Sequence, residues 1–328
     1  MGIYVFHQGA YENGQLWYSY FDGTNWQPDK QVQNVGMSGS PSAVVVPGDG
    51  IYVFHQGFEQ DGNIWYSHFH FDGSTWDPDK QVPNARIGGQ GNFSASPSAI
   101  AFPDGRIAVF YQGLSHDPNP FPGSHGGNNQ LWHFDGTNGD LNTQVYPAPM
   151  TFSPSAVALP APAGAFSVFY NGIERGDGVG SGQDLFYSYF DGTNWQPYTE
   201  VQNVNMWESP SAVVVPGDGI YVFHQGPLQG GSHLGDAQQL WWSHFHFDNS
   251  TWDPDTQVPN RTAPGAQLMS QSPSAVVLPA PEGAVSAFYQ GLGYDGELWY
   301  SYFDGTTWQP NTQVQNVGMS KSPSAVVV

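Results

Sequence analysis

SPSAVVV (residues 40–46), PGDG (47–50) and IYVFHQG (51–57) follow one another without interruption, and this stretch decides the fold. The Ser-Pro-Ser motif recurs six times, beginning at Ser40, Ser96, Ser153, Ser209, Ser272 and Ser322. The motif Phe-His/Tyr-Gln/Asn-Gly also recurs six times, at Phe6, Phe54, Phe110, Phe169, Phe223 and Phe288. A period of about 55 residues is typical of propeller blades, so the repeat indicates the architecture.

Two further segments complete each repeat, as in LWYSYFDGTNWQPDKQV at residues 16–32. All four segments are rich in Val, Ile, Tyr, Phe and Trp, which favour strands, and the residues between them favour turns. The third segment varies in length between repeats by steps of two residues, which preserves the side-chain alternation of a strand. The sequence therefore predicts an all-β fold, a six-bladed β-propeller of four-stranded antiparallel blades.

The two ends of the chain carry complementary parts of one repeat. The chain begins in the IYVFHQG-type segment (residues 3–9) and stops in SPSAVVV (322–328). We expect the C-terminal strand to pair with the N-terminal strand, because this pairing would close the ring and remove an exposed edge. The predicted single domain, 1–328, then has blades at 322–328 plus 1–34, 38–84, 94–147, 151–204, 207–260 and 270–317.

Charge and cysteine content exclude several classes of protein. The 328 residues include only 7 Lys and Arg against 28 Asp and Glu, for a formal net charge of −21. Such a surface repels phosphate backbones and anionic lipids, so we expect neither nucleic acid nor membrane partners. The chain has no Cys, which excludes disulfides and thiol catalysis. No segment has the pattern of a membrane helix or a signal peptide, so we expect a cytoplasmic or non-classically secreted protein, and a homo-oligomer is compatible with the sequence.

The end of the second strand of each repeat carries the first group of candidate ligand-binding residues. Each of these strands ends in an amide, at Gln8, Gln56, Gln112, Asn171, Gln225 and Gln290. The residue before it is an aromatic that can form hydrogen bonds, at His7, His55, Tyr111, Tyr170, His224 and Tyr289. The amides could contact a ligand or cap loop backbone. The histidines lack a His-x-x-x-His or acidic-triad pattern, so neither a metal nor a cofactor is predicted.

The start of the third strand lies on the same predicted rim and carries the second group. An indole opens this strand at Trp17, Trp65, Trp132, Trp241 and Trp299. A polar residue lies two positions before each indole, at Gln15, Asn63, Gln130, Gln239 and Glu297, and Asp184 has the same place before Phe186 in the fourth repeat. An aromatic face beside amide and carboxylate groups suits a sugar, although tryptophans at these positions could equally belong to the core. The loops before this strand are long in three repeats (114–130, 173–184 and 227–239).

These features favour a multivalent carbohydrate-binding lectin, an agglutinin that binds glycans or glycoproteins at repeated pockets and gains affinity through avidity. A protein-interaction scaffold would use the same rim and stays an alternative. A glycosidase is disfavoured, because no repeat breaks the pattern to supply a pair of carboxylates, and no catalytic residue is predicted.

The repeats IYVFHQG, LWYSYFDGTNW and QNVGMSGSPSAVVV resemble those of fungal six-bladed β-propeller lectins, in particular N-acetylglucosamine-binding mushroom lectins of the Agrocybe type. The resemblance covers the whole chain and implies binding of terminal N-acetylglucosamine at rim or inter-blade pockets. The fucose-binding fungal propellers are the nearest alternative. They use an Arg in each repeat, whereas this chain has only Arg86, Arg106, Arg175 and Arg261, which do not recur with the repeat.

Overall fold

Over the residues that it describes, the computed structural model is all-β apart from two short 3-10 helices, η1 (Ala10–Glu12) and η2 (Phe58–Gln60). It describes residues 1–87, 89–90, 93–94, 96–114, 127–137, 140–172, 184–226, 239–259, 269–291 and 296–328. Over these ranges no helix is both long enough and apolar enough to span a membrane.

The strands form antiparallel four-stranded units, numbered here in the order of the repeats. Unit 1 has β24 (Thr312–Val327), β1 (Ile3–Gly9), β2 (Gln15–Phe21) and β3 (Trp26–Val46). Unit 2 has β3, β4 (Gly50–Gly57) and β5 (Asn63–His70). Its fourth strand is in two pieces, β6 (Thr75–Trp76) and β7 (Lys80–Arg86), which both pair with β5. Unit 3 has β10 (Ser98–Ala101), β11 (Ile107–Leu114), β12 (Gly127–Asp135) and β13 (Asp140–Ala158).

The remaining units follow the same order. Unit 4 has β13, β14 (Phe166–Gly172), β15 (Asp184–Phe190) and β16 (Thr199–Asn205). Unit 5 has β17 (Trp207–Val215), β18 (Gly219–Gly226), β19 (Gln239–His246) and β20 (Thr256–Gln257). Unit 6 has β21 (Ser274–Val277), β22 (Val285–Gln290), β23 (Glu297–Phe303) and β24. A separate short pair joins β8 (Gly89–Gln90) to β9 (Phe93–Ser94).

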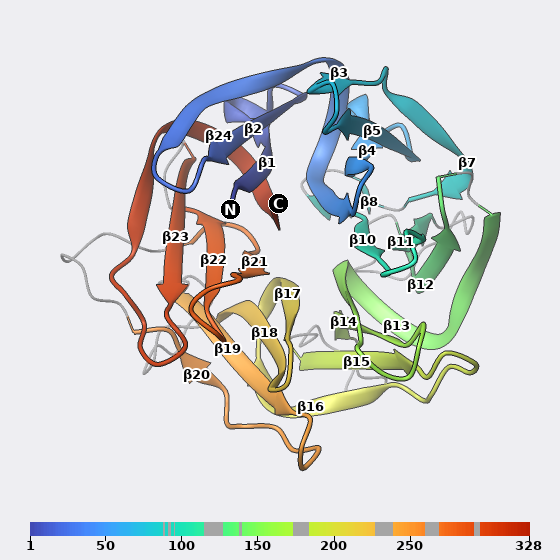
Figure 1. Cartoon of the computed structure of the whole chain (residues 1–328). Helices are drawn as coiled ribbons and strands as arrows, with labels where there is room; N and C mark the ends of the chain where they lie inside the picture. Colours follow the sequence, from blue (N-terminus) through green and yellow to red (C-terminus); the bar gives the residue numbers. More distant parts are fainter. Residues whose placement is uncertain are drawn as a thin grey trace.

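The long strands β3, β13 and β24 each run from the outer strand of one unit into the first strand of the next. Figure 1 shows the units arranged around a common centre, with the two chain ends next to each other. The ends are joined by β1 and β24, whose antiparallel register pairs Ile3 with Val327 and Phe6 with Ser324. Backbone hydrogen bonds of 2.9–3.0 Å between Gly2 and Val328 extend this pairing.

Hydrogen bonds from the SPSA motif link each unit to its neighbour. The hydroxyl of the second serine in one SPSA motif accepts a hydrogen bond from the backbone N–H of the alanine in the SPSA motif of the adjacent unit. The serine and alanine pairs are 324 and 43, 42 and 99, 98 and 156, 155 and 212, 211 and 275, and 274 and 325. The motif therefore recurs because each copy satisfies a backbone donor of another unit.

Aromatic residues fill the space between neighbouring units. The tryptophan of the outer hairpin packs edge-on against the phenylalanine of the second strand in the preceding unit, as Trp76 does on Phe6 with ring centroids 6.0 Å apart. The same contact joins Trp252 to Phe169, Trp308 to Phe223 and Trp26 to Phe288. These phenylalanines are fully buried, so the invariant aromatic position of the repeat belongs to the core.

Candidate functional site

Two equivalent grooves lie between neighbouring units. Groove 1–2 has a volume of about 1000 Å³ and lies between the outer strand region of unit 1 and the outer half of unit 2. Groove 4–5, of about 670 Å³, lies between units 4 and 5. The volumes are in the range of small-molecule sites. The two grooves are lined by corresponding residues of their repeats, so each is one copy of a repeated site.

The walls of each groove combine an aromatic face with polar side chains. In groove 1–2 the partly exposed indole of Trp65 faces the polar segment that contains Gln31, Gln33 and Asn34. The indole N–H of Trp65 donates to Oδ2 of Asp61 at 3.0 Å, which fixes the ring. In groove 4–5, Trp241 takes the place of Trp65, and the polar wall contains Glu200, Gln202 and Asn203. Such a surface can stack on the C–H face of a sugar and bond its hydroxyl or amide groups.

In units 1, 5 and 6 the glycine at the last position of the IYVFHQG motif lies beneath the rim indole. An added Cβ at Gly226 would lie 2.6 Å from the ring of Trp241, and one at Gly291 would lie 2.8 Å from that of Trp299. Gly9 stands in the same relation to Trp17, at 2.7 Å. The indoles therefore lie directly over the strand backbone while remaining partly exposed. Glycine is required here for close approach, not for an unusual φ.

The polar residues two positions before the rim indoles, or before Phe186 in unit 4, vary in exposure. Gln15 and Glu297 are exposed, Asn63 and Asp184 are partly exposed, and Gln239 is buried. Oε2 of Glu297 accepts the indole N–H of Trp299 at 3.2 Å, so this residue orients its aromatic neighbour. The structure brings Trp65 and Trp241 into the two grooves, and Trp17, Trp132 and Trp299 occupy the equivalent rim positions of other units.

The amides of the second strands are buried, and four of the six bond to backbone. Nε2 of Gln8 donates to the carbonyl of Met37 at 3.3 Å, in the segment that leads into the next unit. The same bond joins Gln112 to Met150 at 3.1 Å, Gln225 to Met269 at 2.8 Å and Gln290 to Met319 at 3.1 Å. Gln56 and Asn171 are fully buried as well. Of the two roles open for these amides, this geometry matches backbone capping between units.

The buried histidines belong to internal hydrogen-bond networks. Nε2 of His7 lies 3.1 Å from Oδ1 of Asp29, and the hydroxyl of Ser19 donates to the same oxygen at 3.0 Å. Units 2 and 5 repeat this arrangement at His55 and His224, with Asp79 and Asp255 as partners. The serine bonds the carboxylate and not the imidazole, so this is not the arrangement of a nucleophilic triad.

Where tyrosine replaces the histidine, its partner changes too. The hydroxyl of Tyr111 donates to Asn142 at 2.6 Å, and Asn311 donates to the hydroxyl of Tyr289 at 2.7 Å. Tyr170 bonds Ser188 at 3.0 Å. Burial raises the pKa of Tyr111 to about 12, so its hydroxyl stays neutral near pH 7. These tyrosines, like the histidines, lie below the surface.

The groove wall contributed by the preceding unit is absent from the sequence-based prediction. It comes from the recurring Gln/Glu-Val-Gln/Pro-Asn segment, as at residues 31–34 and 200–203. Its asparagine has positive φ in four repeats, 62° at Asn34, 60° at Asn84, 63° at Asn203 and 62° at Asn316. Asparagine tolerates this left-handed conformation better than most residues. The recurrence of this asparagine in the sequence is therefore the signal from which this wall could have been predicted. The three long loops named above lie almost wholly outside the described residues.

Comparison with known proteins places the fold. No protein-family model matches the chain, and no curated protein sequence does. The fucose-specific lectin of Aleuria aurantia is similar in structure, with a TM-score of 0.61 at 15% identity, over 95% of this chain and 91% of that one. A variant of AofleA from Arthrobotrys oligospora, in which three arginines are replaced by alanine, has a TM-score of 0.60 at 12% identity, over 96% and 83%.

A polysaccharide lyase, an ulvan lyase, is also similar, with a TM-score of 0.51 at 15% identity, over 89% of this chain and 78% of that one. Identities this low establish a shared fold only. Together with four-stranded antiparallel units around a common centre, they show a β-propeller. The expected likeness to N-acetylglucosamine-binding mushroom lectins stays a prediction.

Proposed function

We propose that this protein is a multivalent glycan-binding lectin, built as a single six-bladed propeller that is closed by the pairing of β24 with β1. The cyclic series of serine–alanine hydrogen bonds between units supports six blades and closure. The observation that carries the function is the occurrence of one site twice, in grooves 1–2 and 4–5, with matching aromatic and amide walls. Repeated weak sites give avidity toward glycans and glycoproteins.

Terminal N-acetylglucosamine is the sugar that we propose for these grooves. The indole of Trp65 would stack on the sugar ring, and Gln33 and Asn34 carry both donors and acceptors for an acetamido group. The described walls of the two grooves contain carboxylates such as Asp61 and Asp253, which disfavours an anionic sugar.

Fucose is the second candidate, and the structural neighbours favour it. The Aleuria aurantia lectin is fucose-specific, and the SapL1 lectin was solved with α-methyl fucoside. Against it, arginine does not recur with the repeat in this chain. We propose binding without catalysis, although one neighbour is a lyase. The histidines of the His–Asp pairs are buried, and the grooves gather their polar groups around an indole.

Isothermal titration with methyl N-acetylglucosaminide and with methyl fucoside, alongside a glycan array, tests the proposal. We expect saturable binding of one of the two sugars and its loss in the double variant Trp65→Ala, Trp241→Ala. Tyr11→Ala is the matched control, because this aromatic is 74% exposed and lines neither groove. Failure of both sugars at millimolar concentration would reject the lectin assignment. Unchanged binding by the folded double variant would reject the two grooves as the binding sites, and fucose-only binding would reject the N-acetylglucosamine assignment.

A further inference from the structure

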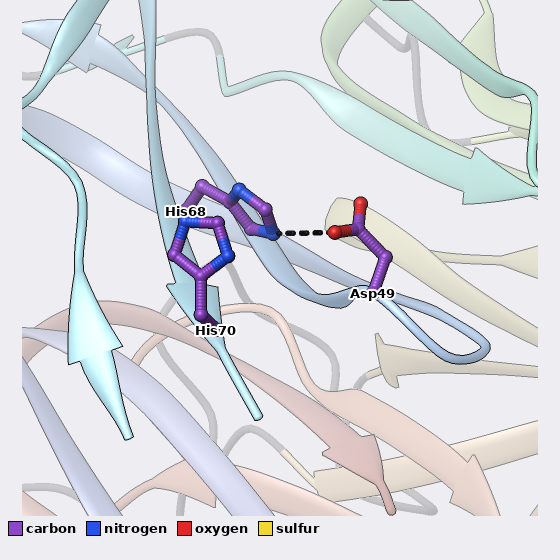
Figure 2. Close-up of side chains that lie close together, drawn as sticks. All are labelled: Asp49, His68 and His70. Atoms are coloured by element: carbon purple, nitrogen blue, oxygen red, sulfur yellow. Dashed lines mark ion pairs between the residues drawn. The ribbon is translucent and has the colours of Figure 1, made fainter. Parts of the chain in front are cut away.

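The third strand is longest in units 2 and 5, and the extension carries a His-x-His pair. The sequence SHFHFD occurs at residues 67–72 and 243–248, where the other complete copies have SYFD or a shorter form. Residues two apart on a strand point to the same face. Figure 2 shows this for His68 and His70 of β5, whose ring centroids lie 4.0 Å apart beside Asp49. Asp49 comes from the turn between β3 and β4.

The buried imidazole of this cluster has an unused nitrogen. His68 is only 5% exposed, and its Nε2 has no hydrogen-bond partner. Oδ1 of Asp49 lies 3.5 Å from this nitrogen, while Oδ2 of the same carboxylate accepts the hydroxyl of Tyr52 at 2.9 Å. Two ligands about 2.0–2.1 Å from a tetrahedral zinc ion lie about 3.3–3.4 Å apart. The Asp49–His68 pair therefore has the separation of two ligands of one ion.

A second carboxylate, that of Asp77, contacts the remaining nitrogen of His68 and one nitrogen of His70. Nε2 of His70 lies 3.1 Å from Oδ1 of Asp77, and Nδ1 of His68 lies 3.9 Å from Oδ2 of that residue. This engagement leaves Nδ1 of His70 for the cluster, in which one atom from each of Asp49, His68 and His70 lies within 4.8 Å of the others. A carboxylate behind a ligating imidazole is the usual outer support of a metal site.

Unit 5 reproduces the arrangement with different residues. Nε2 of His244 has no hydrogen-bond partner, the residue is 4% exposed, and Oδ1 of Asp218 lies 3.5 Å away. The hydroxyl of Tyr221 bonds Asp218 at 2.8 Å. Nε2 of His246 lies 2.9 Å from Asp253, the counterpart of Asp77. Two copies with the same separations argue against a chance approach of side chains.

Two further features suit the clusters to a metal. A Cβ at Gly50 or Gly219 would clash first with the backbone carbonyl of Phe69 or Phe245, and it would also lie 2.7 Å from Nε2 of the buried histidine, on the side where the ion would bind. Imidazole ligands favour zinc and related ions over calcium or magnesium, which take oxygen ligands.

We propose that each cluster binds a divalent transition-metal ion of the zinc class. The ligands are Oδ1 of the turn aspartate, Nε2 of the buried histidine and Nδ1 of the outer histidine, with a fourth position for water. The ion would join the turn between the first two strands to the third strand. Asp77 and Asp253 also line grooves 1–2 and 4–5, so the ion would brace one wall of each groove.

Zinc titration of the EDTA-treated full chain by calorimetry tests the proposal. We expect two equivalents for the unmodified protein, one for His70→Gln or His246→Gln, and none for the double variant. Glutamine can reproduce the Nε2 contact with the aspartate while removing Nδ1. His133→Gln is the matched control, because this histidine lies outside both clusters and should leave two equivalents.

A second measurement separates metal binding from loss of folding. The melting temperature should rise with zinc in the unmodified protein and in His133→Gln, because an ion that binds only the folded state stabilises it. It should not rise in the folded double variant. No saturable uptake at micromolar zinc, or a double variant that binds two equivalents, would overturn the proposal.

Discussion

The hydroxyl of Ser324 accepts a hydrogen bond of 2.8 Å from the backbone N–H of Ala43, 281 positions away in the sequence. Replacing Ser324 with alanine leaves this N–H without its partner, which typically costs about 1–3 kcal/mol. We expect the urea-unfolding free energy to fall by that amount. Thr306→Ala, on an exposed turn, is the control and should change it little. A Ser324→Ala variant as stable as the parent would show that this bond between units is dispensable.

The His7–Asp29 contact predicts a ranked series of stabilities. Asp29→Ala removes the acceptor for His7 and Ser19, and leaving a buried polar group without its partner typically costs about 1–3 kcal/mol. Asp29→Asn should cost less, and His7→Tyr with Asp29→Asn should regain most of the loss, because Tyr289 and Asn311 already form that pair in unit 6. Chemical denaturation of the three variants measures the order. A double variant less stable than Asp29→Ala would contradict the equivalence of the repeats.

The glycine beneath Trp241 provides a test of the groove. Gly226→Ala places a methyl group against the indole, which must move away from the strand. We expect sugar affinity at groove 4–5 to fall about tenfold, or about 1.4 kcal/mol, with a change in tryptophan fluorescence. Gly73→Ala is the control, since its methyl meets only the side chain of Thr75. A fluorescence change without loss of affinity would remove Trp241 from the binding site.

Glu208 gives a pH-dependent prediction. Burial raises the pKa of this carboxyl, although the charge of Lys321 acts in the opposite direction. The folded state therefore favours the protonated form, and stability is lost as the pH rises from the unfolded-state pKa of about 4.5 through the folded-state pKa. Glu208→Gln should be the more stable protein at pH 7, with the difference disappearing below about pH 4. Melting curves between these pH values measure it; a constant difference would contradict the assignment.

Much of the fold could be read from local pattern. The alternation of apolar residues in SPSAVVV and IYVFHQG specifies strands, and glycine in the PGDG turn takes the positive φ seen at Gly48. The two-residue steps in the third strand are compatible only with retained register. These properties depend on neighbouring residues in the chain, so the sequence contains them.

The candidate site was predicted only in part. Trp65 and Trp241 lie in the grooves as the aromatic pattern indicates, whereas the amide wall at 31–34 and 200–203 comes from the preceding unit. A repeat analysed alone cannot show which residue of its neighbour faces it. The amides and histidines share the rim register of the indoles, but packing between units buries them.

The sequence by itself determined the strands, their repetition and the matching chain ends, because hydrophobic alternation and turn residues act over a few positions. Tertiary structure decided which of the repeated indoles, amides and histidines are accessible, because accessibility depends on contacts between units. It also brought Asp49 to His68 and Asp218 to His244, across a turn and a strand that no local pattern connects. The SPSA motif depends on both: the local sequence determines its strand, but its serine hydroxyls find their partners only in the neighbouring unit.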